Sequence, residues 1–181
     1  MLQIVLPEME YYDEANEIFI PVKEQKLQLE HSLVSLSKWE SKWCKPFLSK
    51  QEKTHEETLD YIKCMTVNQN VDPSVYKRLT KKHIKEINDY IAAPMTATFF
   101  SQKEKGGRSG EQVTNELIYY WMVAAQVPFE PCEKWHLNRL LTLIRVCNVK
   151  NQPPKKMSKK ALMSRNAQLN AARRQQLGTS G

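Results

Sequence analysis

Apolar residues recur every three or four positions from residue 33 onward, and this helical spacing constrains the fold more than any other feature of the sequence. The first stretch places five large residues on one helix face: Leu33, Leu36, Trp39, Trp43 and Phe47. Further helices are predicted over residues 54–65, from Thr80 to Pro94, over 111–127 and over 132–149. The spacing therefore predicts a mainly α protein, a bundle of about five helices.

The first thirty residues follow a different pattern. Three short runs are apolar or alternate between polar and apolar residues: Leu2–Leu6, Glu17–Val22 and Lys26–Leu29. They predict a small β-element of two or three antiparallel strands, so the fold class is α+β with helices dominant. The sequence leaves open whether these strands pair within the chain or with a second copy, and an unpaired edge would suit a homo-oligomer.

Residues 117–123 form an unbroken apolar run that fits either a buried strand or a buried helix. The length of the surrounding segment and the acidic Glu111 and Glu116 near its start favour a helix, which Pro128 ends. Pro131 is then expected in the first turn of the next helix. We expect these two helices to form a hairpin that makes the core of the protein.

Charge divides the chain near the double proline Pro153–Pro154. The net charge is +7, but residues 150–181 carry eight Lys and Arg residues and no Asp or Glu, whereas residues 1–149 carry nineteen Lys and Arg against twenty Asp and Glu. We therefore predict a globular body over residues 1–151, with a β-element at 1–30 and helices at 32–151. A basic tail follows at 152–181, where Ser158 is placed to cap a final basic helix.

The basic tail is a candidate binding segment through its seven most C-terminal cations: Lys155, Lys156, Lys159, Lys160, Arg165, Arg173 and Arg174. They could dock on an acidic protein surface or bind nucleic-acid phosphates, and a solvated tail is the third reading. No aromatic residue follows Trp135, so the tail has no stacking platform for single-stranded nucleic acid. The charge pattern leaves all three readings open.

Trp39 and Trp43 are a second candidate binding surface. Their predicted helix also carries Lys38, Lys42 and Lys45, so an exposed aromatic edge beside these cations would suit a protein partner. The alternative for both tryptophans is a place in the core, where large aromatic residues are most often found.

Catalytic and metal-binding patterns are weak. The chain has five glycines, three of them in the linker-like stretch 101–110, and no glycine-rich nucleotide-binding motif. Cys132 and His136 are one helical turn apart, but a zinc site needs further ligands that their helix does not supply. We expect a non-enzyme without metal or cofactor.

The apolar stretches and the cysteine spacing bear on membrane insertion and on the redox state of the thiols. No stretch approaches eighteen apolar residues, so no membrane span is expected. The four cysteines show no Cys-x-x-Cys spacing, which suits reduced, mostly buried thiols in a cytoplasm.

Four stretches of the sequence carry a resemblance to known proteins: HSLVSLSKWESKWCKPFL (31–48), ETLDYIKCMT (57–66), IYYWMVAAQVPFEPCEKWHLNRLLTLIRVCNVKN (118–151) and PPKKMSKKALMSRNAQLNAARR (153–174). Through them the chain resembles a family of small proteins from tailed bacteriophages and prophages. The class that they most resemble is the tail assembly chaperone. This resemblance covers whole segments and supplies no residue-level motif.

The resemblance implies a helical protein that works in the host bacterial cytoplasm. It would bind tail tube and tape measure proteins during virion morphogenesis, without catalysis. The alternative is a virion structural protein of the neck, tail or capsid, whose basic tail contacts a protein or DNA.

Overall fold

The computed structural model describes residues 1–13, 17–100, 112–152 and 158–178. The chain divides into two compact units, Met1–Asn148 and Val149–Gly181. This division falls three residues before the boundary predicted between body and tail. The linker-like stretch 101–110 and the double proline at 153–154 lie outside the described residues.

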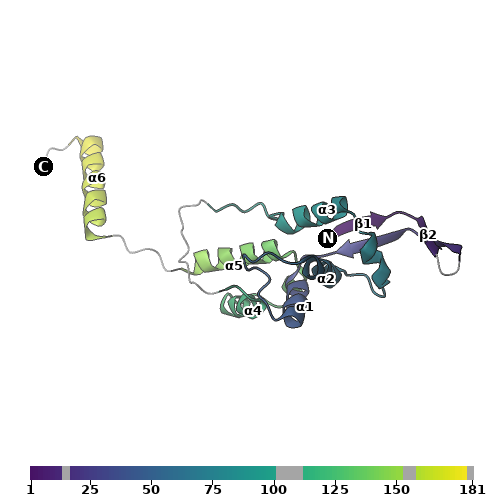
Figure 1. Ribbon diagram of the computed structural model, residues 1–181. Helices are drawn as coiled ribbons and strands as arrows, with labels where there is room; N and C mark the ends of the chain where they lie inside the picture. Colours follow the sequence, from purple (N-terminus) through teal and green to yellow (C-terminus); the bar gives the residue numbers. More distant parts are fainter. Residues whose placement is uncertain (14–16, 101–111, 153–157, 179–181) are drawn as a thin grey trace. The chain divides into compact units, whose positions relative to one another are not determined.

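The fold is mainly α with a small N-terminal β-element, as the spacing of apolar residues predicted (Figure 1). Its strands are β1 (Leu2–Leu6), β2 (Met9–Asp13), β3 (Ile18–Val22) and β4 (Gln25–Leu29). Its α-helices are α1 (Leu33–Trp43), α2 (His55–Met65), α3 (Lys81–Ala92), α4 (Asn115–Ala124), α5 (Leu137–Asn151) and α6 (Lys159–Leu177). Two 3-10 helices, η1 (Pro73–Arg78) and η2 (Cys132–Lys134), complete the described elements.

The β-element has four strands in the described chain, not the two or three predicted. They form two antiparallel pairs, β1 with β4 and β2 with β3. The β1–β4 pair turns one face inward, so that Ile4, Leu6, Leu27 and Leu29 are at most 2% exposed. Residues that follow α2 pair with β4, because Val67 donates its N–H to the Gln28 carbonyl at 2.8 Å. The β1–β4 pair is thereby built into the body.

The helix starts follow local capping chemistry. Ser32 accepts the Ser35 N–H at the start of α1, and Thr54 forms a capping box with Glu57 at the start of α2. Helix α1 ends at Cys44, which adopts the left-handed conformation (φ 51°) and donates its N–H to the Glu40 carbonyl. The helix therefore stops before Pro46, although the apolar spacing continues to Phe47.

The apolar run at residues 117–123 lies within helix α4 and is therefore a helix, as predicted, and not a buried strand. The helix predicted from Cys132 onward is wrong in its first turn, because η2 ends at Lys134 and α5 begins only at Leu137. The backbone between them pairs with the start of α1: Ser32 and His136 form an isolated bridge, and Leu137 donates to the His31 carbonyl at 2.7 Å. Pro131 precedes η2 and does not lie in the first turn of α5.

The core is broader than the hairpin of α4 and α5 that the sequence predicted. Its buried side chains come from β1, β4 and every helix from α1 to α5, with α1 packed on α2 and on α4. Several large side chains of the second predicted hairpin helix, residues 132–149, are only partly buried: Trp135, Leu141, Leu143 and Cys147. The prediction failed because the β1–β4 face and α2 supply much of the apolar surface that the helices cover.

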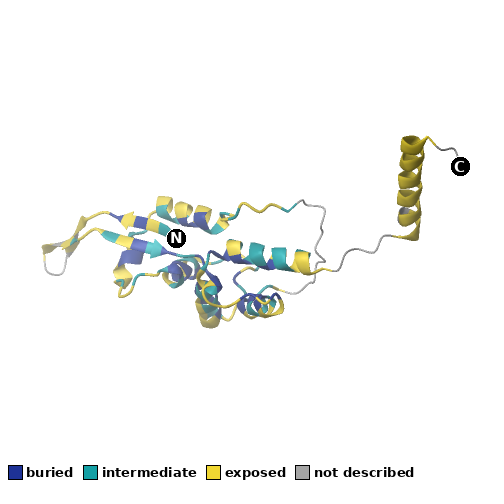
Figure 2. Ribbon diagram, turned by 180° about the vertical axis from the view of Figure 1, so that it is seen from behind, coloured by how far each residue is buried: buried dark blue, intermediate teal, exposed yellow. Residues whose placement is uncertain are grey.

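Helix α6 confirms the predicted basic C-terminal helix. Its first turn includes a hydrogen bond from the Leu162 N–H to the Ser158 carbonyl at 2.9 Å. All of its residues with a described burial are exposed, as Figure 2 shows by the yellow colour along this helix. Over the described ranges, no helix has the length and hydropathy needed to cross a membrane.

Candidate partner-binding surfaces

Strands β2 and β3 form a two-stranded ribbon that projects from the body beyond the β1–β4 pair (Figure 1). We call this ribbon, residues 9–13 and 18–22, the β2–β3 arm. Its register pairs Met9 with Val22 and Tyr12 with Phe19. In the part of the chain that the structure describes, no third strand joins the arm, so both of its outer edges lack a β partner.

Apolar side chains are exposed on both faces of the arm. Met9, Tyr12, Ile18 and Phe19 are 47%, 45%, 51% and 66% exposed. Tyr12 and Phe19 lie opposite each other on one face, with ring centroids 4.9 Å apart. Met9 and Ile18 lie on the other face, because side chains alternate along a strand. These four apolar side chains are therefore left uncovered on the two faces of the arm.

This exposure distinguishes the arm from the rest of the β-element. An isolated two-stranded ribbon is marginal in water, and open edges with exposed apolar residues are typical of surfaces that bind another chain. Among the described residues, the arm is the surface that best fits a partner. The sequence predicted one of its strands and an unpaired edge suited to a homo-oligomer, but not its exposed apolar faces.

The arm and the residues that flank it are also acidic. Residues 1–22 hold five Asp and Glu and no Lys, Arg or His. Of these acids, Glu8, Glu10 and Glu17 are exposed. The partner that covers the arm is therefore expected to bring positive charge together with apolar side chains.

Helix α6 places the predicted basic residues on a surface with no acidic neighbour on the same helix. Lys159 and Lys160 lie at its start, Arg165 in its first half, and Arg173 and Arg174 near its end. The two basic pairs are separated by roughly 21 Å, at 1.5 Å per residue. Lys155 and Lys156, predicted as part of the same surface, lie outside the described residues.

Apolar residues interrupt the charge of α6. Leu162 and Leu169 are seven residues apart, so they share a side of the helix, and each is 47% exposed. Lysines at a helix start oppose the helix dipole, and a single uncovered helix of this length is marginal in water. Helix α6 thus has the composition of a segment that is stabilised by docking on an acidic, partly apolar surface.

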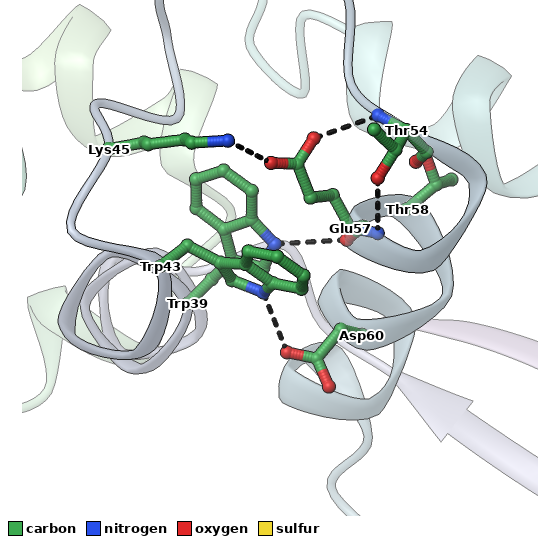
Figure 3. Close-up of polar contacts among 7 residues, drawn as sticks. All are labelled: Trp39, Trp43, Lys45, Thr54, Glu57, Thr58 and Asp60. Carbon is green, nitrogen blue, oxygen red and sulfur yellow. Dashed lines mark hydrogen bonds and ion pairs between the residues drawn. The ribbon is translucent and has the colours of Figure 1, made fainter.

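Trp39 does not present the exposed edge that the sequence suggested. It is 1% exposed, packs edge-on against Phe47 and donates its indole N–H to the Glu57 carbonyl at 2.9 Å (Figure 3). The expectation of an exposed surface at this residue is wrong, because α2 packs over the face of α1 that carries it.

Trp43 is half-buried and lies between α1 and α2. Its indole N–H donates to Asp60 Oδ2 at 3.0 Å, and Lys42 Nζ lies 2.6 Å from Oδ1 of the same carboxylate (Figure 3 shows the indole contact). Burial acts to raise the pKa of Asp60, but the hydrogen bonds from Lys42 and Trp43 outweigh it and lower the pKa. These contacts hold the two helices together, and a role for Trp43 in partner binding stays a prediction.

Glu57 joins the same interhelical network. Its carboxylate accepts from Lys45 Nζ at 2.6 Å and from the Thr54 N–H at 2.8 Å (Figure 3). The Lys45 hydrogen bond and the capping bond both lower the pKa of Glu57. A carboxylate held ionised by a capping box and a lysine has a structural role.

Two buried residues with catalytic potential, Glu40 and His136, are engaged in structural contacts. Glu40 is buried and accepts three hydrogen bonds from Phe47 and Asn115. Buried His136 has its Nε2 3.0 Å from the Tyr90 carbonyl. Over the described ranges, no three His, Cys, Asp or Glu side chains lie close enough to hold a metal ion.

The cysteines are free, but fewer are buried than expected. Cys132 is buried, Cys64 and Cys147 are partly buried, and Cys44 is exposed. Cys44 lines a shallow hollow of about 330 Å³ with Glu40, Lys45 and Asn115. Glu40 is occupied by its hydrogen bonds, so it is a poor general base for this thiol.

Comparisons with known proteins give no family for the chain. No protein-family model matches it, and no curated protein and no solved structure matches it either. The features of the described chain that bear on function are therefore its two exposed surfaces, the β2–β3 arm and helix α6.

Proposed function

We propose that this protein is a non-enzymatic binding protein that assists the assembly of a larger protein structure. The observation that carries the proposal is the β2–β3 arm, whose apolar side chains are exposed on both faces and whose edges are open. A ribbon of this kind binds partners by adding a strand at its edge, with side chains on either face providing specificity.

The resemblance of four sequence stretches to tail assembly chaperones supports a specific form of this proposal. In that form the partners are the tail tube and tape measure proteins of a tailed bacteriophage, and binding takes place in the host cytoplasm. A chaperone of this class needs a folded body and adhesive segments, and the β2–β3 arm and helix α6 meet the second need.

The second candidate is a virion structural protein whose basic segment contacts a protein or DNA. The charge of residues 150–181 favours it, because eight cations without an acidic residue neutralise phosphates in a salt-dependent way. Mass spectrometry of purified virions separates the two candidates, since a chaperone is released and a structural protein remains in the particle.

The first test changes the exposed residues of the arm. Replacing Ile18 and Phe19 by serine removes apolar contact area from both faces, and we expect the affinity for the tail tube or tape measure protein to fall at least about tenfold. Binding is measured by capture of the purified partners and by calorimetry. Helix content should stay unchanged, because neither side chain packs in the core.

The matched control is Leu48→Ser, which removes an exposed apolar residue outside the arm. It should bind the partners as the unmodified protein does. Failure of the unmodified protein to capture either partner would remove the chaperone proposal, and equal loss in the Leu48 variant would remove the role of the arm.

A further inference from the structure

We infer that helix α6 of one molecule binds the β2–β3 arm of a second copy of this chain. The inference rests on the proposed function in one respect, that the arm is a binding surface. It goes beyond that proposal by naming an occupant for the arm and by giving helix α6 a target.

Charge complementarity is the first argument. The segment 1–22 has five acidic and no basic residues, and the segment 150–181 has eight basic and no acidic residues. The exposed members of the two sets include Glu10 and Glu17 on one side and Arg173 and Arg174 on the other. Complementary segments of this size attract each other and fix the orientation of binding.

Apolar complementarity is the second argument. Each surface sets exposed apolar side chains among its charges: Met9, Ile18 and Phe19 on the arm, and Leu162 and Leu169 on α6. A charged helix with a strip of leucines can cover an apolar ribbon while its lysine and arginine heads reach the acidic residues. Burial of these side chains would stabilise both segments, each of which is marginal by itself.

Chain length favours a second copy as the source of the helix. Helix α5 is about 22 Å long, and the strand from Leu29 to the near end of the arm at Val22 adds about 23 Å. Leu137 at the start of α5 hydrogen-bonds to His31, next to Leu29, and from there α5 and the arm extend toward opposite ends of the body (Figure 1). The eight residue steps from Asn151 to Lys159 span at most about 28 Å. Even with the connection fully extended and α6 continuing in line with it, Leu162 and Leu169 lie at most about 32 Å and 43 Å from Asn151. Both leucines therefore fall short of the arm of the same chain, about 45 Å away, whereas those of a neighbouring molecule are not limited in this way.

Reciprocal exchange gives the assembly a defined form. If each molecule places its α6 on the arm of the other, the contact closes as a twofold dimer with two identical interfaces. The same contact made in one direction only would produce an open chain, which light scattering distinguishes by its growing mass.

Charge reversal in the full-length protein tests the inference. One variant carries Glu10→Lys with Glu17→Lys, and the other carries Arg173→Glu with Arg174→Glu. Sedimentation and light scattering at low salt should give twice the mass of one chain for the unmodified protein. Each variant alone should be monomeric, with a dissociation constant raised at least about tenfold. An equimolar mixture of the two variants should regain the dimer, because basic α6 then meets acidic arm and acidic α6 meets basic arm.

A control variant with Glu52→Lys and Glu86→Lys has the same change in net charge as the Glu10 and Glu17 variant, at exposed positions outside the arm. This control should remain dimeric. A monomeric unmodified protein, unchanged dimerisation in both reversed variants, or a mixture that stays monomeric would overturn the inference. Capture of tail proteins is measured separately. If the unmodified protein is monomeric, and replacing Ile18 and Phe19 by serine still abolishes capture of the tail proteins, the self-pairing is overturned and the proposed function stands.

Discussion

Replacing Glu40 by alanine is expected to lower the free energy of unfolding by about 4 kcal/mol. Glu40 is 7% exposed, and its carboxylate accepts the Phe47 N–H at 2.7 Å, the Asn115 N–H at 2.7 Å and the Asn115 side-chain amide at 2.8 Å. Alanine would leave all three donors buried without an acceptor, and each such donor costs about 1–3 kcal/mol. The loss is measured by urea unfolding followed by circular dichroism.

Glu40 matters to the fold because it joins segments far apart in the sequence. It fixes the turn after α1 through Phe47 and the first residue of α4 through Asn115. Glu40→Gln keeps one acceptor oxygen and should lose about half as much stability.

The control for Glu40 is Glu116→Ala, which removes an exposed carboxylate one residue from Asn115. Only a weak interaction with the helix dipole is lost there, so the cost should be about 0.5 kcal/mol. A loss below about 1 kcal/mol in Glu40→Ala would contradict the structural role of this carboxylate.

Helix starts were predictable because their determinants lie within four residues. Ser32, Thr54 and Thr80 each begin a predicted helix, and each accepts a hydrogen bond from the backbone three residues later. The apolar spacing that follows each cap is equally local. The mainly α fold class with a small β-element could therefore be predicted from the sequence.

Features that depend on distant contacts could not be predicted. Nothing near Trp135 in the sequence shows that the backbone beside it pairs with His31 and Ser32, so the break between η2 and α5 was missed. In the same way, the burial of Trp39 depends on the position of α2. The spacing of residues on α1 identifies a face but not what covers it.

The candidate site was predicted in part. The charge of α6 was visible, because an excess of Lys and Arg needs no structure to be recognised. Strand β3 was predicted as the run Glu17–Val22, but β2 was missed, and the exposure of apolar side chains on both faces of the arm could not be predicted from local spacing. Its signal was the five acids within the first 22 residues, interleaved with aromatic and β-branched residues.

Lowering the pH from 7.5 to 5.0 is expected to reduce the free energy of unfolding by about 2 kcal/mol through His31. This side chain is 2% exposed, and burial, together with the charge of His136, lowers its pKa from 6.5 to about 4. Nδ1 lies 2.5 Å from the Tyr61 hydroxyl. Burial raises the pKa of Tyr61 well above its usual range, so this hydroxyl keeps its proton and can donate it to the neutral imidazole.

The direction follows from which state binds the proton. Below pH 6.5 the unfolded chain protonates His31, while the folded protein resists protonation until about pH 4. Stability is therefore full above pH 6.5 and falls through the window from 6.5 to 4, by about 3 kcal/mol in all. Burial also lowers the pKa of His136, which adds to the loss in the same direction.

Two histidine variants separate this effect from general acid destabilisation. His31→Gln removes the titrating group, so the difference in unfolding free energy between pH 7.5 and 5.0 should shrink to the share of His136, whatever the variant's stability at pH 7.5. His55→Gln changes an exposed histidine and should keep the full difference. The lowered pKa values of Glu57 and Asp60 act in a more acidic range, because lowered carboxyl pKa values lose their contribution only near or below pH 4. An NMR titration in which the His31 ring protonates near pH 6.5 in the folded protein would contradict the prediction directly. A histidine with the same pKa in the folded and unfolded states contributes nothing to the pH dependence of folding.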